Sequence, residues 1–302
     1  MSAIIDVRGL TKSFNEIAAV DNLTFTVKES GVYGFLGQNG AGKSTTIRML
    51  LSLIRPTGGE IKIFGLDLVT HRREILRRTG AIIEKPDLYK YLTAIENLNL
   101  FAAMSGLNLT RKQLMDKLEK VGVAERADSK IRTYSQGMKQ RLGIAVALVH
   151  DPDLIILDEP MNGLDPQGIA DIRQLINHLS KDLGKTLFIS SHLLSEMEQV
   201  ADSLLIIHKG KKIAEGNMDE LLNPEQSRIE VETGSAKEFE LKLKQTSWVN
   251  KIISVNGQKI IMQMKKEEVP AFVQQMGEMK QDIFSIRKKN SLEDYFLSLT
   301  SH

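Results

Sequence analysis

Two acidic residues, Asp158 and Glu159, follow directly after the apolar run 154–157. An uninterrupted apolar run of this length is typical of a strand that is buried on both faces. Neighbouring carboxylates at the end of such a strand repel each other, and removing them from water costs free energy. Taken alone, the pair fits a cation-binding site and fits equally well two solvated acids.

The segment GQNGAGKST, residues 37–45, has the chemistry of a phosphate cradle. It matches the pattern G-x-x-x-x-G-K-[ST] between a predicted strand and a predicted helix, which is the context that this pattern requires. Its glycines let backbone N–H groups face a polyphosphate, and the helix N-terminus adds a positive end. We expect Lys43 to reach the β- and γ-phosphates and Ser44 to bind Mg²⁺. Beside this loop, Asp158 is expected to hold Mg²⁺ and Glu159 to polarise an attacking water.

These residues need a scaffold that places several strand ends side by side. Strands alternate with helices along residues 1–222, an order that implies a mainly parallel, layered sheet and an α/β fold. A long segment, about 86–150, is helical by its period and predicts a helical subdomain. The predicted strands are 4–10, 23–29, 32–37, 61–65, 80–84, 154–158 and 186–191, followed by a hairpin at 203–216.

The pattern changes after NPEQ, residues 223–226. From there the predicted elements follow the order βαββαβ, which is that of a ferredoxin-like domain. Asn256 and Gly257 mark the turn between the two central strands, and SLEDYFLSL, 291–299, predicts a final helix. We therefore expect a small α+β accessory domain at 223–302, with either a regulatory ligand-binding role or a dimer-stabilising or solubilising one.

Composition excludes several function classes. The 302 residues contain no cysteine, so disulfides, cysteine-based zinc sites and thiol nucleophiles are absent. The net charge of +2 is not the general footprint of a nucleic-acid-binding protein. The N-terminus has no apolar signal-peptide region, and no stretch reaches the ~18 apolar residues of a membrane span. In a membrane process, other chains would therefore have to supply the membrane part.

The joint order of these motifs resembles the nucleotide-binding subunits of ABC transporters over about residues 1–222. GQNGAGKST corresponds to the Walker A motif of that family, and LIILDEP corresponds to its Walker B motif. YSQGM, 134–138, takes the place of the signature LSGGQ, and NGLDP, 162–166, takes the place of the D-loop. The resemblance implies a P-loop NTPase core that binds ATP through Gly37, Gln38, Asn39, Gly40, Ala41, Gly42, Lys43, Ser44 and Thr45.

Residues outside the phosphate loop take roles from the same resemblance. Phe14 stands at the position of the aromatic side chain that stacks on adenine. His192 matches the family's switch histidine, which can donate to the γ-phosphate and joins Glu159 as a catalytic residue. Ser135 and Gly137 match the signature residues that face the ATP of the opposite subunit. The resemblance also implies that Asp165 of the D-loop contributes to ATP binding.

Two departures from the family pattern bear on function. Gln136 replaces the first glycine of the signature and could change the loop geometry, although the Ser135 hydroxyl and the second glycine are kept. Glu84 ends a predicted strand where the family usually has glutamine, and we expect it to bind Mg²⁺ together with Ser44 and Asp158. With the C-terminal extension, these features resemble the bacterial bacitracin-resistance and lantibiotic-immunity exporters.

The resemblance implies an ATPase that dimerises on ATP, as a homodimer or as a heterodimer with a related subunit, and that drives a separate transmembrane permease. The loop 86–89 would meet this permease. We expect export of an antibiotic, peptide or drug-like substrate, from a cytoplasmic position on the inner face of the bacterial cell membrane. The alternative is a non-transport ABC ATPase that acts on the ribosome or on DNA. One phosphate loop, no sustained heptads and no basic or aromatic cluster in the C-terminal domain argue against it and against nucleic acid as a partner.

Overall fold

The computed structural model describes residues 3–222, 228–288 and 292. The chain forms two compact units, Met1–Gly216 and Asn217–His302. The sequence-based boundary at 222/223 lies later than this division, after the short helix α8 (Met218–Leu222), which the structure groups with the second unit. The final helix predicted at 291–299 lies outside the described residues, apart from the buried Leu292.

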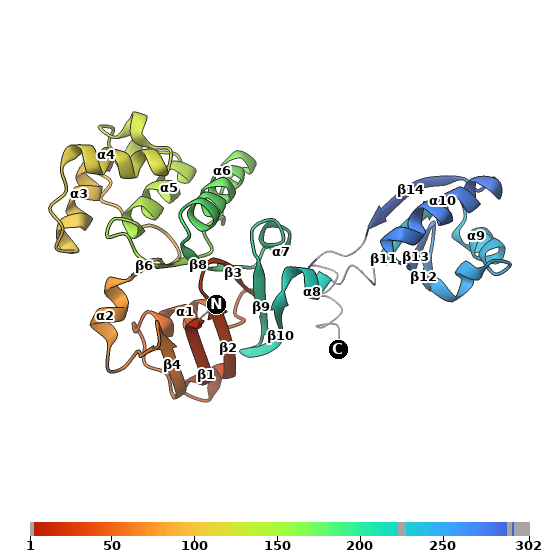
Figure 1. The fold of residues 1–302 in the computed structure, drawn as a ribbon, viewed down its shortest axis with the longest axis horizontal. Helices are drawn as coiled ribbons and strands as arrows, with labels where there is room; N and C mark the ends of the chain where they lie inside the picture. The colour runs from red at the N-terminus through yellow and green to blue at the C-terminus, as the bar shows by residue number, and fades with distance from the viewer. Residues whose placement is uncertain (1–2, 223–227, 289–291, 293–302) are drawn as a thin grey trace. The chain divides into compact units, whose positions relative to one another are not determined.

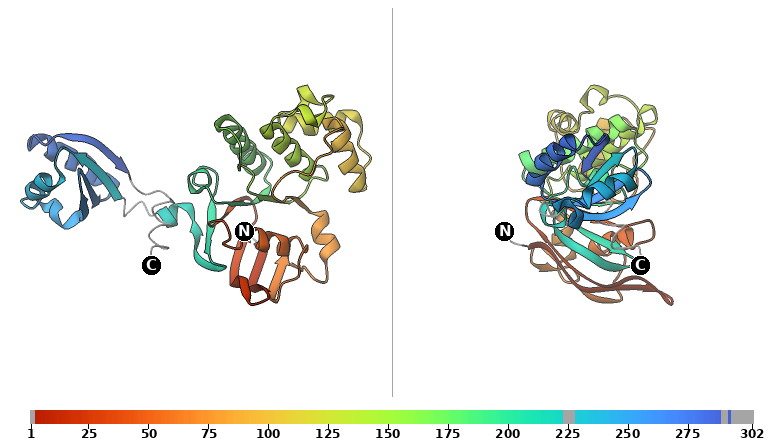
Figure 2. Two further views of the ribbon diagram at one scale, coloured as in Figure 1. Left: turned by 180° about the vertical axis from the view of Figure 1, so that it is seen from behind. Right: turned by 90° about the vertical axis from the view of Figure 1, so that its right-hand side faces the viewer.

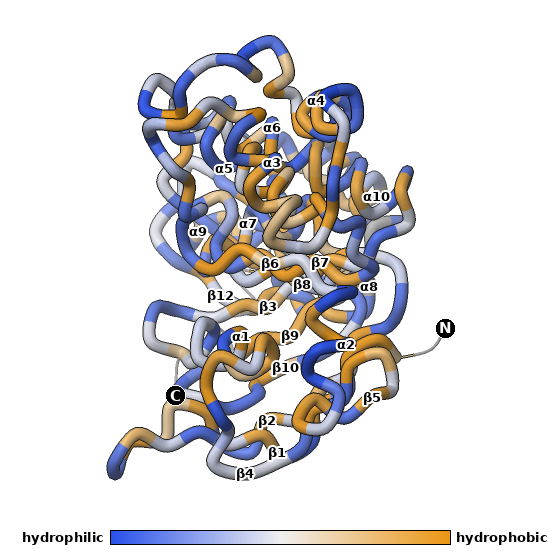
Figure 3. The backbone as a smooth tube through the Cα atoms, turned by 90° about the vertical axis from the view of Figure 1, so that its left-hand side faces the viewer, coloured by the Kyte–Doolittle hydropathy of each residue, from blue (hydrophilic) through white to orange (hydrophobic). Residues whose placement is uncertain are grey.

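The first unit contains a six-stranded sheet with the strand order β10-β9-β3-β8-β7-β6. β3 pairs in parallel with β8 and β9, and β7 pairs in parallel with β6 and β8. The middle strands are apolar and buried along most of their length, as expected for strands covered on both faces (Figure 3). The bounds are β3 (Gly31–Leu36), β6 (Thr79–Ile82), β7 (Leu154–Asp158), β8 (Thr186–Ser191), β9 (Ser203–His208) and β10 (Lys211–Asn217).

A second, antiparallel sheet lies beside it in the same unit, with the order β2-β1-β4-β5. The sequence predicted one mainly parallel sheet, and this antiparallel sheet was missed. Residues 23–28 alternate between buried and exposed, which is the pattern of an antiparallel strand with one wet face. Helix α1 (Lys43–Leu50) contacts both β2 and β7 and so joins the two sheets (Figure 1). The bounds are β1 (Ala3–Phe14), β2 (Ile17–Lys28), β4 (Gly58–Ile63) and β5 (Leu66–Asp67).

The predicted helical subdomain is a group of helices in which α3, α4 and α5 contact one another (yellow to green in Figures 1 and 2). Thr93 and Thr110 begin α3 and α4 with capping boxes, in which the threonine hydroxyl and a Glu96 or Gln113 side chain satisfy backbone N–H groups reciprocally. The bounds are α3 (Ala94–Met104), α4 (Arg111–Lys120), η1 (Ala124–Arg126), η2 (Ile131–Thr133) and α5 (Gln136–Ala147).

Of the remaining helices of the first unit, α2 (Arg72–Arg77) leads from the antiparallel sheet into β6, and the others connect strands of the parallel sheet. These others are α6 (Pro166–Asn177), the π-helical turn η3 (His178–Asp182) that continues α6, and α7 (Leu194–Met197). Within the described ranges of both units, none of the helices combines the length and apolar character needed to cross a membrane.

The second unit has the predicted βαββαβ order and an antiparallel sheet arranged β12-β13-β11-β14. Its core contains Phe239, Trp248 and Phe272, and the Trp248 indole donates to Gln275 Oε1 at 2.6 Å. The bounds are β11 (Arg228–Thr233), α9 (Ala236–Leu243), η5 (Ser247–Lys251), β12 (Ile252–Asn256), β13 (Lys259–Gln263), η6 (Lys266–Glu268), α10 (Val269–Glu278) and β14 (Ile283–Lys288).

Candidate active site

The candidate site lies where three neighbouring parallel strands end. β3 leads into the phosphate loop, β7 ends at Asp158, and β8 ends one residue before His192. The register places Leu36 opposite Ser191 and Asp158 opposite Ser190. Because parallel strands share one carboxyl edge, these distant segments of the sequence meet there.

The phosphate loop has the tight backbone that the motif predicts. Gly42 has a φ of 106°, and a Cβ atom at this position would lie 2.5 Å from the Ala19 carbonyl oxygen, so only glycine fits. Within the described part of the chain, the N–H groups of Asn39, Gly40, Gly42 and Lys43 donate to no protein acceptor. A run of free donors at a helix N-terminus is suited to a polyphosphate.

Lys43 is almost fully buried inside this loop. Its Nζ donates to the carbonyl oxygens of Gly37 at 2.7 Å and Gln38 at 3.2 Å. The same Nζ lies 3.2 Å from Glu159 Oε1, in an ion pair whose two side chains are both largely buried. The lysine is therefore positioned at the loop and is directly connected to the second acidic residue.

Asp158 is completely buried at the end of β7. Its Oδ1 accepts a 2.5 Å hydrogen bond from Ser190 Oγ, whereas its Oδ2 has no hydrogen-bond partner. A buried carboxylate oxygen without a donor is costly, and a cation is the ligand that would compensate for it. This oxygen therefore fits the predicted Mg²⁺ site.

Glu159 is held in an unusual backbone conformation, with a φ of 51°. Its N–H group is shared between Ser190 Oγ at 3.0 Å and the Ser190 carbonyl oxygen at 3.2 Å. Its Oε2 lies 2.8 Å from His192 Nδ1. Left-handed backbone is strained for residues other than glycine, and such strain often occurs at functional sites. Ser190, which contacts both acids, was missed by sequence reasoning, although the two serines that precede His192 are visible in ISSHLL.

Phe14 ends β1 with its side chain 51% exposed, and Lys12 Nζ lies 5.0 Å from the ring centre. A core position for this phenylalanine is therefore excluded. An exposed aromatic face beside a cation is available for stacking with a flat ligand such as a purine.

The signature segment begins α5 as predicted. Ser135 is the N-cap, and its hydroxyl accepts from Met138 N at 3.2 Å. Gln136 is the first residue of the helix and does not have a positive φ, so this position does not require the family's glycine. Asp165 is the N-cap of α6 and accepts from Gly168 N at 2.9 Å. A Cβ atom on Gly137 would lie 3.7 Å from Gly168 Cα, so the two helix starts are close.

Tyr134 precedes this helix and anchors it to the rest of the helical subdomain. Its hydroxyl donates to the Arg126 carbonyl oxygen at 2.6 Å. Partial burial raises the pKa of the Tyr134 hydroxyl, so it remains a donor at neutral pH. This departure from the family's leucine therefore has a structural contact of its own.

Glu84 is in a different environment from the other two acids. It is exposed, has a φ of 59°, and its Oε1 accepts from Arg48 at 2.8 Å. Across the described residues, no cluster of three or more histidine, aspartate or glutamate side chains is arranged to hold a metal. The structure thus gives Glu84 a cationic partner on α1, and its role toward Mg²⁺ stays a prediction.

Charge balance indicates which class of ligand this arrangement suits. The free N–H groups of the loop suit an anion, whereas the unpartnered oxygen of Asp158 suits a cation. A nucleoside triphosphate with its metal carries both charges, and this combination at the carboxyl edge of a parallel sheet is typical of P-loop NTPases.

Comparison with known proteins narrows this class. Residues 20–162 match the family described as ABC transporter. The chain is 42% identical to the bacitracin transport ATP-binding protein BcrA of Bacillus licheniformis, over 99% of this chain and 98% of that protein. It is 39% identical to the lantibiotic transport ATP-binding protein SrtF of Streptococcus pyogenes, over 73% of this chain and 96% of that protein.

A solved dimeric ATP-binding cassette, in a post-hydrolysis state with ADP and Pi, has the same fold. It is 25% identical, with a TM-score of 0.63 over 71% of this chain and 98% of its own. The chain therefore belongs to the ABC transporter family, as an ATP-binding and ATP-hydrolysing subunit. The resemblance to bacitracin and lantibiotic transport proteins is confirmed.

Proposed function

We propose that this subunit binds Mg²⁺–ATP at the loop 37–45, dimerises around it, and uses hydrolysis to drive a separate membrane permease that exports an antibiotic or related peptide. The observation that carries the proposal is the link from Lys43 through Glu159 to His192. It joins the residue that would bind phosphate to a carboxylate and a histidine suited to act on water and on the γ-phosphate.

Mg²⁺ would be held by Asp158, Ser44 and, as the sequence predicts, Glu84. Asp158 Oδ2 supports this assignment because it is buried and has no hydrogen-bond partner. The bound metal would neutralise developing charge on the phosphates. Ser190 fixes Asp158 Oδ1, so the rotation of the carboxylate is set and Oδ2 is left for the cation.

Glu159 would be the general base, because its carboxylate lies beside the phosphate lysine and its backbone is fixed by Ser190. His192 would orient this carboxylate through Nδ1 and donate to the γ-phosphate with its other ring nitrogen. Lys43 must turn from the loop carbonyls and from Glu159 toward the phosphates when ATP binds. That exchange would release the Glu159 oxygen that takes the proton of the water.

The dimer would place the α5 N-terminus of one subunit on the ATP of the other. Ser135 begins that helix, so its hydroxyl and the following backbone N–H groups lie at a positive helix end. The dimeric state of the similar cassette with ADP and Pi supports dimerisation. The partner would be a second copy of this chain or a related subunit.

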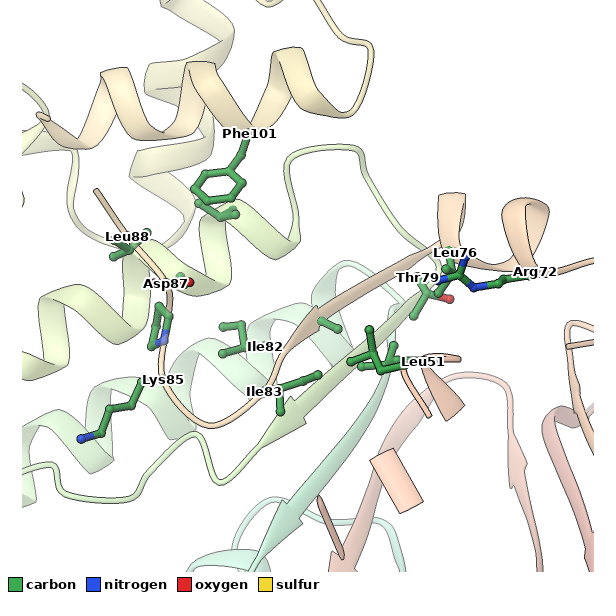
Figure 4. Close-up of a pocket in the computed structure, with 15 residues that line it drawn as sticks. Leu51, Arg72, Leu76, Thr79, Ile82, Ile83, Lys85, Asp87, Leu88 and Phe101 are labelled. Atoms are coloured by element: carbon green, nitrogen blue, oxygen red, sulfur yellow. The ribbon is translucent and has the colours of Figure 1, made fainter. Parts of the chain in front are cut away.

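The permease would bind at a groove of about 410 Å³ between the strand β6, the helix α2 and the helical subdomain (Figure 4). The predicted contact loop 86–89 contributes Pro86, Asp87 and Leu88 to its wall. Leu53, which is 57% exposed, also lines it. An open apolar groove suits a short amphipathic segment of a partner. Its apolar lining includes Leu51, Leu76, Ile82, Ile83, Leu88 and Phe101.

A cytoplasmic position at the inner face of the cell membrane follows from this partnership. Both relatives are named as transport ATP-binding proteins, which favours transport over action on the ribosome or DNA. The bacitracin transport protein matches this chain from end to end, so a peptide antibiotic is the substrate class that we propose.

Two experiments test this proposal. First, the chain and the membrane protein encoded beside it are expressed in a bacitracin-sensitive host, with Glu159→Gln as the inactive control. A higher inhibitory concentration of a peptide antibiotic for the wild type alone supports export, and identical values across an antibiotic panel contradict it. Second, Leu53→Asp should lose co-purification with the permease. Leu241→Asp, on α9 and also exposed, should keep it.

A further inference from the structure

A basic surface on α2 takes no part in ATP hydrolysis and touches the permease groove only through Arg72. We define this α2 surface as Arg72, Arg73 and Arg77, all of which are exposed. The inference about this surface rests on the proposed function, because the position of the permease groove determines which way the surface faces. Arg78 is not part of it, since Arg78 pairs with Asp153 at 2.8 Å and stacks on Phe64 at 3.9 Å.

The three arginines lack counter-charges from the protein. Within the described ranges, none of them forms an ion pair with an acidic side chain, and α2 contains only Glu74 as an acid. Like charges on adjacent turns of a helix are mildly destabilising when no anion is present. An anion bound from outside would remove this repulsion.

The face that carries the arginines continues directly from the groove. Arg72 and Leu76 line the groove at one end of it (Figure 4). Arg73 follows Arg72 by one residue, and Arg77 follows Leu76 in the same way. One residue corresponds to a rotation of about 100° around the helix axis. The surface therefore begins at the groove rim and extends outward from it.

An exposed apolar side chain lies three residues before the start of this helix. Val69 is 84% exposed, which is the largest exposure among the large apolar residues of the described chain. Its turn is well ordered, because Asp67 Oδ1 accepts from Val69 N and Thr70 N, both at 3.0 Å. A fixed turn that presents valine to solvent beside three free arginines has the chemistry of a membrane-interface contact.

We propose that the α2 surface binds the anionic headgroups of the lipid bilayer beside the permease, with Val69 entering the headgroup layer. Guanidinium groups bind phosphate oxygens in a bidentate manner, and each basic side chain near an anionic surface strengthens binding about fivefold. This contact would align the subunit with the membrane while its groove holds the permease. An acidic segment of the permease is the competing partner for the same arginines.

Vesicle binding tests the proposal without ATP and without a permease. The full chain is sedimented with phosphatidylcholine vesicles that contain or lack phosphatidylglycerol. We expect binding only to the anionic vesicles, with a loss on raising the salt concentration. Arg72→Gln, Arg73→Gln and Arg77→Gln together should weaken it on the order of 100-fold. Replacement of the same three residues by lysine should retain most of it.

A matched triple variant on α4 controls for net charge. Arg111, Lys112 and Lys120 are exposed, and their replacement by glutamine removes the same charge from another helix, although Arg111, unlike the α2 arginines, pairs with Asp128 at 2.8 Å. This variant should bind anionic vesicles like the wild type. Because the chain has no cysteine, Val69→Cys can carry a single polarity-sensitive dye, which should shift to the blue on anionic vesicles. The same dye at Ile17→Cys, also exposed, should not shift.

Equal vesicle binding by the two triple variants overturns the proposal, as does binding that is independent of anionic lipid. If the α2 variant loses only co-purification with the permease, the arginines serve the permease and the lipid assignment is wrong. ATPase activity measured on the same samples separates the two claims. If the wild-type chain hydrolyses no ATP, the proposed function is contradicted, whereas the result on lipid binding remains valid.

Discussion

Lys43 Nζ and Glu159 Oε1 lie 3.2 Å apart, so the lysine of the phosphate loop and the proposed catalytic base form one ion pair. Both side chains are largely buried, and the other oxygen of the same carboxylate contacts His192. Breaking a buried pair is costly unless another charge replaces the partner. The γ-phosphate is such a charge, and its arrival would make the base available only when ATP is present.

Ser190→Ala should lower ATP turnover by about 10–100-fold, with nucleotide binding largely kept. The hydroxyl fixes Asp158 and also accepts from the N–H of Glu159, so its loss loosens both acids. Steady-state ATPase assays and nucleotide titration measure the two effects. Ser191→Ala is the control, because its hydroxyl accepts from Leu193 N and contacts neither acid. Similar turnover in both variants would contradict the role of Ser190.

Glu84→Gln should raise the Mg²⁺ concentration needed for half-maximal ATPase activity and perturb transport in the complex with the permease. Arg48→Gln should lower that concentration, because it removes the cation that pairs with Glu84. Titration of ATPase activity with Mg²⁺ measures both. If Glu84→Gln and Glu84→Ala leave the Mg²⁺ requirement and transport unchanged, Glu84 is a surface acid that only pairs with Arg48.

A chain that ends at Leu222 should remain soluble and bind ATP, because the phosphate loop and both acids lie within the first unit, which has its own core. Limited proteolysis of the full chain should cut near residues 223–227. Mass spectrometry of the fragments and two separate unfolding transitions would support two independent folds. One cooperative transition without a stable fragment of about this length speaks against them.

Acidification should destabilise the first unit through His150. Burial lowers the pKa of its imidazole below the ordinary value of 6.5, and the ring contacts the Thr79 carbonyl oxygen. The unfolded chain therefore binds the proton first, so stability falls as the pH drops below about 6.5 and levels off below the folded pKa. His150→Gln should lose less stability than the wild type between pH 7 and 5, as measured by thermal unfolding. Parallel curves for the two proteins would rule this out.

The site was predictable where its chemistry is contiguous in the sequence. The loop 37–45 needs glycines, a lysine and a helix start at fixed spacing, so the pattern locates it directly. The apolar run before Asp158 likewise marks a strand buried on both faces. Ser190 was missed because its contact with Asp158 depends on the pairing of β7 with β8, which short-range patterns do not encode. The same holds for Arg48 and Glu84.

The fold was predictable to a similar extent. In the second unit, alternating strands and the turn at Asn256 and Gly257 predicted the observed element order. The antiparallel sheet of the first unit was missed, although its signal was present in LTFTVK, 23–28. The strict alternation of buried and exposed residues there indicates a strand with one solvent-exposed face. The continuous apolar run 154–157 of the parallel sheet instead indicates a strand buried on both faces.

The most direct test of the account is ATP turnover by Glu159→Gln. Glutamine keeps the size of the side chain and removes the base, so we expect ATP binding to persist and turnover to fall by ~10²–10⁴-fold. Size-exclusion chromatography with ATP and Mg²⁺ should then show a dimer that accumulates, because hydrolysis no longer separates the subunits. Normal turnover in Glu159→Gln, measured on protein shown to bind ATP, would contradict the central claim that Glu159 activates the hydrolytic water.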